Sequence, residues 1–295
     1  MPTSALNTPA PGTDAAPGRL RSRFRSTPRS RRRRRSTLTR PAGLALGISV
    51  LWFSLLVMIP LALLLISSVE DGWSTFWDTL TNVQTANAIR LTLVSALAVT
   101  AVNLVMGLLI AWVLVRDRFP GRWLIELMID IPFALPSLVA GLVLLSLYGP
   151  ESPLGINVLG TPASVFLALL FVTLPFVVRT VQPVLGELDR DVERAAHSLG
   201  ASRATTVRRI ILPALTPALA AGATLCFARG VGEFGALVIL TGNRPNISEG
   251  APMRIQSYIE VDNTAAAATV AVLLLATALA ATLLVEILTS KERPR

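Results

Sequence analysis

The amino-acid sequence predicts an all-α membrane protein with six transmembrane helices. Hydrophobic residues make up 52% of its 295 positions, charged residues only 15%, and the mean hydropathy is +0.60. The chain is therefore far more apolar than a soluble domain of this size. Six apolar stretches reach the length of about 18 residues that a helix needs to cross a bilayer. These predicted spans are residues 44–66, 89–115, 123–147, 162–184, 211–240 and 265–288.

The segment before the first span differs from the rest in composition. The net charge of the chain is +9, and residues 1–43 alone contain 11 arginines and one aspartate. This segment has too few apolar residues to form a core, so we expect a disordered, Arg-rich tail. Its positive charge favours the cytoplasmic side of the membrane. Since this retention explains the arginine run without any ligand, we expect no nucleic-acid partner.

The basic residues of the loops indicate the orientation independently. Cytoplasmic segments of membrane proteins carry an excess of Lys and Arg. Six spans that begin with a cytoplasmic tail end with a cytoplasmic C-terminus, residues 291–295. Apart from the tail, the segments on this side hold 12 basic residues, whereas the opposite side holds three, Arg90, Arg244 and Arg254. The predicted orientation therefore does not depend on the arginine run.

One polar loop, residues 187–213, separates two apolar spans and has a pattern of its own. Valine, alanine and leucine residues recur at helical spacing between Asp189 and Leu199, which predicts a short amphipathic helix with small residues at its centre. We expect Gly200 to end this helix with a positive φ, and Ser202 to cap the next helix. Such a small-faced helix at the membrane surface can dock closely onto another protein.

The spacing in this loop resembles the EAA loop, E-A-A-x3-G-x9-I-x-L-P, of ABC importer permeases. In that family the loop forms a coupling helix that sits in a groove of the ATPase subunit. The glycine and the I-x-L-P tail match, but an arginine occupies the position of the family's glutamate and the acid lies one residue earlier. The residues to which the resemblance gives a role in ATPase coupling are Glu193, Arg194, Ala195, Ala196, Gly200, Ile210, Leu212 and Pro213.

Three longer stretches extend the resemblance to most of the chain. They are DIPFALPSLVAGLVLLSLYG (130–149), LPFVVRTVQPVLGELDRDVERAAHSLGAS (174–202) and FARGVGEFGALVILTGNRPNISEGAP (227–252). They are similar to the permeases of sulfate, thiosulfate and molybdate importers, and the third is most similar to the T-type subunit of sulfate importers. The resemblance implies a type I ABC importer (MetI-like) permease fold over residues 44–290, in the inner membrane of a prokaryote.

The resemblance also implies a set of partners. In a type I importer two permeases form the pore, two ATPase subunits bind ATP-Mg on the cytoplasmic side, and an extracytoplasmic binding protein delivers the oxyanion. In sulfate systems the second permease is usually a distinct W-type subunit, so we expect a heterodimer. This chain is expected to be no enzyme and to bind no cofactor itself. Its single lysine, Lys291, leaves no G-x4-G-K-[ST] phosphate loop, and its single histidine, His197, has no ligand set for a metal around it.

Three ionisable residues, Asp130, Arg229 and Glu233, lie at or near membrane depth. A charge that faced lipid would be costly, so we expect these side chains to face protein or water. Arg229 and Glu233 are four residues apart and could pair on one face of a helix. They are candidates for the translocation path, where an anion would meet them, and equally for an ion pair that only holds two helices together.

Two alternatives to a sulfate importer remain open. Molybdate and tungstate have the same charge and tetrahedral shape as sulfate, so an importer of these anions is the nearest alternative. A channel or secondary transporter that needs no ATP would also explain the charges in the spans. It would leave the spacing from Gly200 to Pro213 without an explanation.

Overall fold

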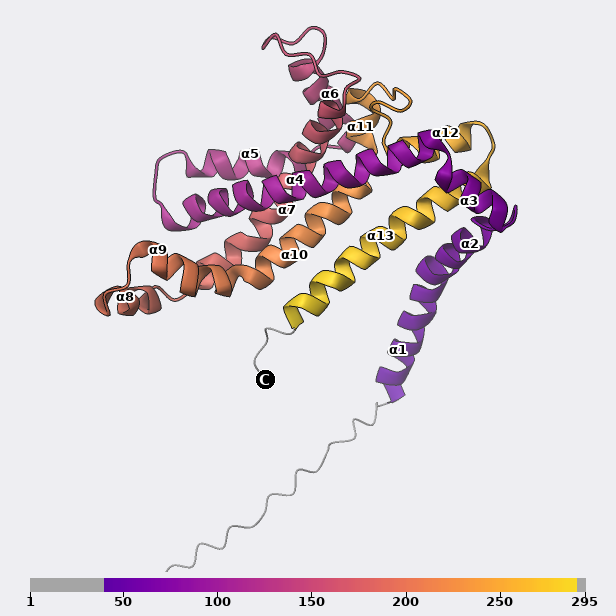
Figure 1. The fold of residues 1–295 in the computed structure, drawn as a ribbon. Helices are drawn as coiled ribbons and strands as arrows, with labels where there is room; N and C mark the ends of the chain where they lie inside the picture. The colour runs from indigo at the N-terminus through magenta and orange to yellow at the C-terminus, as the bar shows by residue number, and fades with distance from the viewer. Residues whose placement is uncertain (1–39, 291–295) are drawn as a thin grey trace, which may run out of the picture. The chain divides into compact units, whose positions relative to one another are not determined.

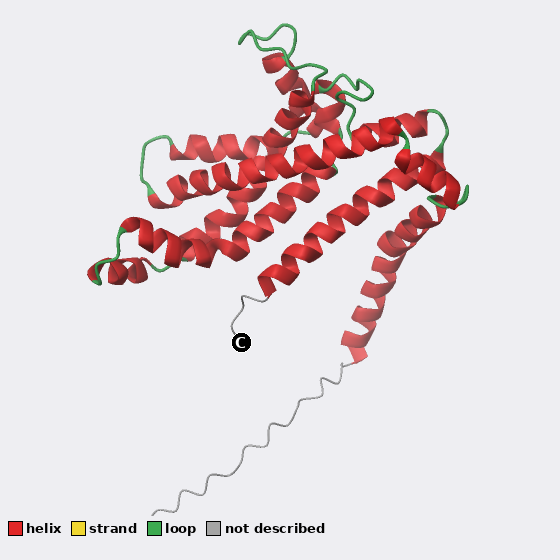
Figure 2. Ribbon diagram, in the orientation of Figure 1, coloured by secondary structure: helices red, strands yellow, loops and turns green. Residues whose placement is uncertain are grey.

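The computed structural model describes residues 40–290, and every regular element in this range is an α-helix or a π-helical turn (Figures 1 and 2). The predictions for residues 1–39 and 291–295 lie outside the described residues. The chain divides into two compact units, Met1–Leu51 and Trp52–Arg295. The first unit contains most of α1 (Arg40–Phe53), and the second contains all the later elements.

Thirteen α-helices and two π-helical turns make up the described part of the chain. They are α1 (Arg40–Phe53), η1 (Ser54–Met58), α2 (Ile59–Ser67), α3 (Trp73–Thr81), α4 (Val83–Arg116), α5 (Arg122–Ala134), α6 (Ser137–Tyr148), α7 (Pro162–Glu187), α8 (Arg190–Ser198), α9 (Arg203–Thr206), η2 (Val207–Ile211), α10 (Leu212–Val231), α11 (Gly235–Leu240), α12 (Ala251–Glu260) and α13 (Thr264–Ser290). Each π turn ends two residues before a proline, Pro60 or Pro213. Because proline donates no backbone hydrogen bond, both wider turns lie where the regular helical ladder is interrupted.

Among residues 40–290, five stretches of helix are long and apolar enough to cross a membrane, and the number is six if the bent pair α5 and α6 counts as one span. The five are Ala42–Ser67, Val83–Arg116, Pro162–Glu187, Arg203–Val231 and Thr264–Val285. A helix satisfies all its backbone hydrogen bonds internally, which is what the hydrocarbon interior requires of a spanning segment. The prediction of an all-α membrane fold is confirmed.

The prediction of one continuous helix over residues 123–147 is wrong. α5 and α6 meet there at an angle of 117°, and Figure 1 shows the chain changing direction between them. Leu135, at the bend, has an extended backbone with φ −82° and ψ 135°. It precedes Pro136, whose ring disfavours the helical conformation in the residue before it.

The predicted span at residues 211–240 is also divided. α10 ends at Val231, a turn that contains Glu233 follows, and α11 begins at Gly235. A Cβ atom on Gly235 would lie 2.2 Å from Ser137 Oγ at the start of α6. Because only glycine allows this approach, α11 packs directly on α6 instead of continuing the axis of α10.

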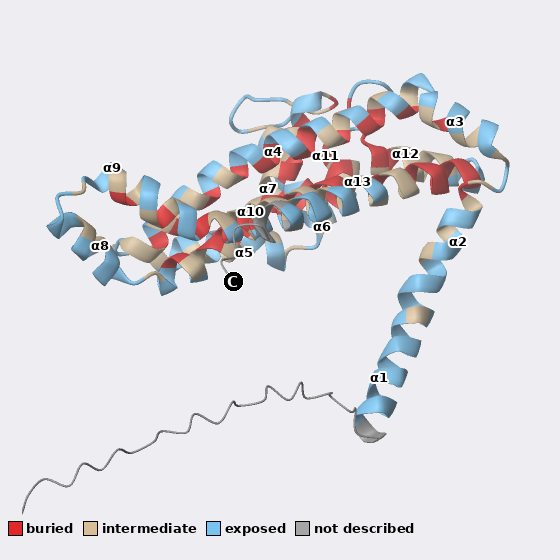
Figure 3. Cartoon of the chain, turned by 60° about the horizontal axis from the view of Figure 1, so that its bottom comes forward, coloured by how far each residue is buried: buried red, intermediate tan, exposed pale blue. Residues whose placement is uncertain are grey.

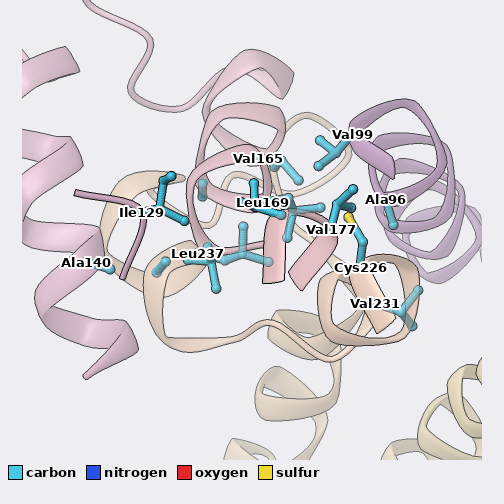
Figure 4. Packing of buried hydrophobic residues seen from close by; sticks show 14 of the residues in the cluster. Ala96, Val99, Ile129, Ala140, Val165, Leu169, Val177, Cys226, Val231 and Leu237 are labelled. Atoms are coloured by element: carbon cyan, nitrogen blue, oxygen red, sulfur yellow. The ribbon is translucent and has the colours of Figure 1, made fainter. Parts of the chain in front are cut away.

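α4, α7 and α10 pack closely at the centre of the second unit. A Cβ atom on Gly107 of α4 would lie 2.8 Å from Val177 Cγ1, and one on Gly222 of α10 would lie 3.3 Å from Val177 Cα. The two glycines thus let both helices approach α7 at the same residue. Figure 4 shows Val177 among buried side chains of these helices, including Ala96 and Cys226.

The outward faces of the membrane helices are apolar and exposed (Figure 3). On α4, for example, Leu97, Val105 and Leu109 are each more than half exposed, whereas Val99 and Ala111 are buried. Exposed apolar surface of this extent is unfavourable in water, so these faces require lipid or another subunit.

Candidate functional site

The loop between α7 and α10 contains the short helix that the sequence predicts between Asp189 and Leu199, which is α8, Arg190–Ser198. Asp189 caps α8, since its carboxylate accepts a hydrogen bond of 2.8 Å from the backbone N–H two residues later. Gly200 follows α8 with a φ of +85°. Its N–H donates to His197 O, and the N–H of Ala201 donates to Ala196 O, both at 3.0 Å. This pair of bonds is the Schellman motif, which stops a helix and turns the chain.

The chain enters the next helix immediately after this turn. Ser202 Oγ accepts a hydrogen bond of 3.2 Å from Thr205 N–H and so caps α9, which confirms the prediction. No described atom beyond the chain neighbours of Gly200 lies within 4 Å of the position that its Cβ would occupy. The requirement for glycine is therefore one of backbone conformation rather than of space.

α8 presents an apolar face that the described chain does not cover. No residue of α8 is buried, as Figure 3 also shows. Val192, Ala195 and Leu199 follow one another at helical spacing, and Leu199 is 89% exposed. We call these three residues the docking face. A leucine so exposed next to small residues is typical of a surface that another protein covers.

Glu193 and Arg194 point in different directions. Glu193 forms an ion pair with Arg116, the last residue of α4, and its side chain is 22% exposed. Arg194 pairs with Asp191 at the surface, and its side chain is 76% exposed. Glu193, the acid one residue before the position of the family's glutamate, is thus paired within the chain. Arg194, at that position itself, directs its guanidinium outward. The sequence alone does not reveal Arg116 as the partner of Glu193, because 77 residues separate the two.

The end of the motif belongs to the membrane helix rather than to the docking face. Ile210 and Leu212 are half-buried beside the buried Ile211, and Pro213 is exposed near the start of α10. Leu212 N–H donates to Val207 O, five residues back, within η2. The I-x-L-P residues therefore set how α10 begins, at a distance along the chain from α8.

Arg229 and Glu233 form the ion pair that their spacing predicts, with 2.5 Å between Arg229 Nη1 and Glu233 Oε2. The expectation that both lie on one helix is wrong, because α10 ends at Val231. Glu233 is fully buried, whereas the side chain of Arg229 is 36% exposed. Glu233 Oε1 also accepts a hydrogen bond of 2.9 Å from Ala236 N–H. One carboxylate thus ties the end of α10 to the start of α11.

Asp130 of α5 is paired with Arg179 of α7 by two hydrogen bonds, of 2.8 and 2.5 Å. Arg179 also donates to Gln182 Oε1 at 2.9 Å. The prediction for Asp130 included no partner, and Arg179 was counted among the 12 basic residues of the cytoplasmic side although it lies within the predicted span 162–184. The structure places Arg179 inside the fourth apolar span, where a bidentate contact neutralises both charges. The sequence feature that could have indicated this pair is the presence of one arginine and one aspartate within apolar spans.

A profile of one transport family matches most of the described chain. The family is described as the binding-protein-dependent transport system inner membrane component, and it matches residues 103–294. The sulfate transport system permease protein CysT of Salmonella typhimurium is 41% identical over 243 residues, which cover 80% of this chain and 88% of that protein. CysT of Synechocystis sp. is 38% identical over 248 residues, covering 82% and 87% respectively.

Solved structures share the fold at lower identity. A chain of a bacterial alginate ABC transporter superposes with a TM-score of 0.70 at 15% identity, covering 84% of this chain and 93% of that one. A chain of the MetNI methionine ABC transporter, in an inward-facing conformation, superposes with a TM-score of 0.57 at 19% identity, covering 76% and 100%. The MetI-like permease fold is thus confirmed. The chain belongs to the binding-protein-dependent transport system inner membrane components, among the sulfate transport permeases of the CysT type.

Proposed function

We propose that this chain is the T-type permease subunit of an ATP-driven sulfate and thiosulfate importer and forms part of the anion path. The observation that carries the proposal is the 41% identity to CysT over 80% of the chain. The chain itself is no enzyme. ATP-Mg belongs to the partner ATPase, whose hydrolysis supplies the energy for import.

The docking face of α8 is proposed to sit in a groove of the ATPase subunit on the cytoplasmic side. The turn at Gly200, which has the Schellman motif, joins α8 to α9 and, through η2, to α10. The ion pair between Arg116 and Glu193 joins α8 to α4. A displacement of α8 by the ATPase would therefore reach two membrane helices at once, which is what coupling of ATP hydrolysis to transport requires.

The anion path is proposed to pass near the ion pairs of the spans. A divalent oxyanion that loses its hydration needs cations or N–H donors in the constriction. Arg229 is the best candidate to meet it, because its guanidinium stays partly exposed while its counter-ion Glu233 is fully buried. Asp130, neutralised by Arg179, is proposed to border the path without repelling the anion.

Two further partners follow from the proposed assembly. The exposed apolar faces of the spans require lipid and a second permease, which we propose to be a distinct W-type subunit. An extracytoplasmic binding protein would present the anion to the outer loops. Since sulfate and molybdate share charge and shape, this protein is expected to make most of the selection between them.

Reversing the charge of Arg116 alone is expected to weaken ATPase association more than exchanging the charges of the pair. Arg116→Glu places two carboxylates against each other and pushes α8 away from α4. Arg116→Glu/Glu193→Arg restores the attraction. The measurement is the amount of ATPase that co-purifies with the permeases, with Arg118→Glu, at an exposed position in the loop that follows α4, as the control. A double variant no better than the single one would contradict the role of the pair.

Deletion of residues 1–35 is expected to leave topology and uptake largely unchanged. Without the tail, and with Arg179 inside a span, the predicted cytoplasmic side still carries 11 basic residues against three on the other side, which is enough to orient the spans. Cysteine accessibility in intact cells, with single cysteines placed in the loop after Gly200 and near Asn246, measures the orientation. Exchange of the two accessibility patterns would show that the tail sets the topology.

The substrate is tested by labelled sulfate uptake in a strain that lacks this chain. Reintroduction of the chain should restore uptake, and unlabelled thiosulfate should compete whereas molybdate should not. A variant of the partner ATPase that binds but cannot hydrolyse ATP should abolish uptake. Restored uptake of molybdate instead of sulfate would assign the alternative oxyanion, and uptake independent of ATP hydrolysis would assign a channel or secondary transporter.

A further inference from the structure

Two neighbouring cavities meet at Trp112, near the end of α4. The first is polar, has a volume of about 550 Å³, and is lined by Trp112, Arg116, Arg190, Glu193, Arg194 and His197. The second is apolar, has a volume of about 310 Å³, and is lined by Leu108, Leu109, Trp112, Val207, Leu212 and Leu215. A cationic cavity beside an apolar cavity suits an amphiphilic ligand, which has a charged group and an apolar part.

The two cavities are stacked along the axis of α4. Leu108, Trp112 and Arg116 are four residues apart, which is slightly more than one helical turn, or about 6 Å of axis, per step. α4 ends at Arg116, where the chain leaves the apolar span. The polar cavity therefore lies at the membrane surface, and the apolar cavity begins about one turn deeper. This is the order in which the headgroup and the acyl chains of a phospholipid are arranged.

The charges around the polar cavity leave one guanidinium without a counter-ion. Glu193 pairs with Arg116, and Asp191 pairs with Arg194. Arg190 has no ion pair among residues 40–290, and its Nη2 only approaches the backbone carbonyl of Val115 at 3.4 Å. The site thus carries one net positive charge, equal and opposite to the charge of a phosphodiester.

We propose that the two cavities together bind one anionic phospholipid, with its phosphodiester at Arg190 and an acyl chain between α4 and the start of α10. A free inorganic anion could use the guanidinium but would leave the adjoining apolar cavity empty, which favours a lipid. Only the assignment of the lipid to the cytoplasmic leaflet rests on the proposed function. The bound lipid would touch α4, α8 and α10, which are joined by the ion pair between Arg116 and Glu193 and by the turn at Gly200.

The test is photolabelling of the assembled importer, with both permeases and the ATPase subunits, in proteoliposomes. Phosphatidylglycerol or phosphatidylcholine with a photoactivatable acyl chain is added at the same mole fraction, and labelled peptides are identified by mass spectrometry. Peptides that contain Leu108 to Trp112 or Val207 to Leu215 should be labelled several-fold more by phosphatidylglycerol. Peptides from the exposed face of α13 should be labelled equally by both lipids.

Two variants and one control complete the experiment. Arg190→Gln should lower phosphatidylglycerol labelling of the site to the phosphatidylcholine level, whereas Arg208→Gln, an exposed arginine outside both cavities, should not. Leu109→Trp, which fills the apolar cavity from an exposed position, should remove the preference with Arg190 intact. Equal labelling by the two lipids, or a preference that persists in both variants, overturns the proposal. So does displacement of the labelling by added inorganic phosphate. Because the readout is lipid labelling, it stands whether or not the complex carries sulfate.

Discussion

Gly200→Val is expected to abolish ATP-driven sulfate uptake while the protein remains in the membrane. Gly200 has a φ of +85°, and the left-handed conformation costs an L-residue about 1–2 kcal/mol, more for a β-branched one. Valine would lose the two hydrogen bonds of the Schellman motif and redirect α8, and with it the docking face. No described atom lies close enough to clash with the new side chain, so the spans should be unaffected.

The matched control at this position is Gly200→Asn. Asparagine tolerates positive φ far better than valine, so it should retain most of the uptake although it is as large. The measurements are labelled sulfate uptake, the amount of this chain in the membrane, and co-purification of the ATPase. Equal uptake by the valine variant and the wild-type protein would show that the turn is not needed for coupling. Equal losses in the valine and asparagine variants would indicate a steric contact with a partner instead.

Arg229→Gln is expected to be far more damaging than Glu233→Gln. Without Arg229 the fully buried carboxylate of Glu233 has no compensating charge, a situation that costs on the order of 3–5 kcal/mol. Glu233→Gln leaves a guanidinium that is already 36% exposed and keeps an oxygen that can accept from Ala236 N–H. The first variant should therefore lower the amount of folded chain in the membrane, and the second should lower it much less.

The double variant Arg229→Gln/Glu233→Gln separates a structural role from transport. It leaves no buried charge, so the amount of folded chain should recover. If the pair only joins α10 to α11, sulfate uptake recovers as well. If Arg229 also guides the anion, as we propose, uptake stays low at normal expression, because the constriction has lost its cation. Two single variants that both behave like the wild-type protein would contradict any role for the pair.

The sequence by itself determined the features that depend on composition or on near neighbours. The apolar stretches had to become helices, because a bilayer offers no hydrogen-bond partners to an unfolded backbone. The cap at Asp189, the positive φ of Gly200 and the cap at Ser202 each depend on residues at most five positions away. The pairing of Arg229 with Glu233 could be predicted for the same reason, because the two residues are only four positions apart.

Only the tertiary structure decided where the spans bend. Hydropathy over residues 123–147 measures how apolar a stretch is and carries no information about its direction. The 117° bend at Leu135 and the end of α10 at Val231 therefore escaped it. Proline and glycine mark places where a helix can break. Whether the helix breaks at such a place depends on what packs against it. At Gly235, the packing partner is the start of α6.

The charge partners were likewise a matter of packing. Asp130 and Arg179 are 49 residues apart, and Arg116 and Glu193 are 77 apart, so no local pattern joins them. Each pair forms because membrane helices from distant parts of the chain lie side by side, and because a charge near the bilayer is stable only where an opposite charge or water meets it. The sequence could place Asp130 at membrane depth and Glu193 in a polar loop, but only the packing of α5 on α7 and of α8 beside α4 determined which charges meet them.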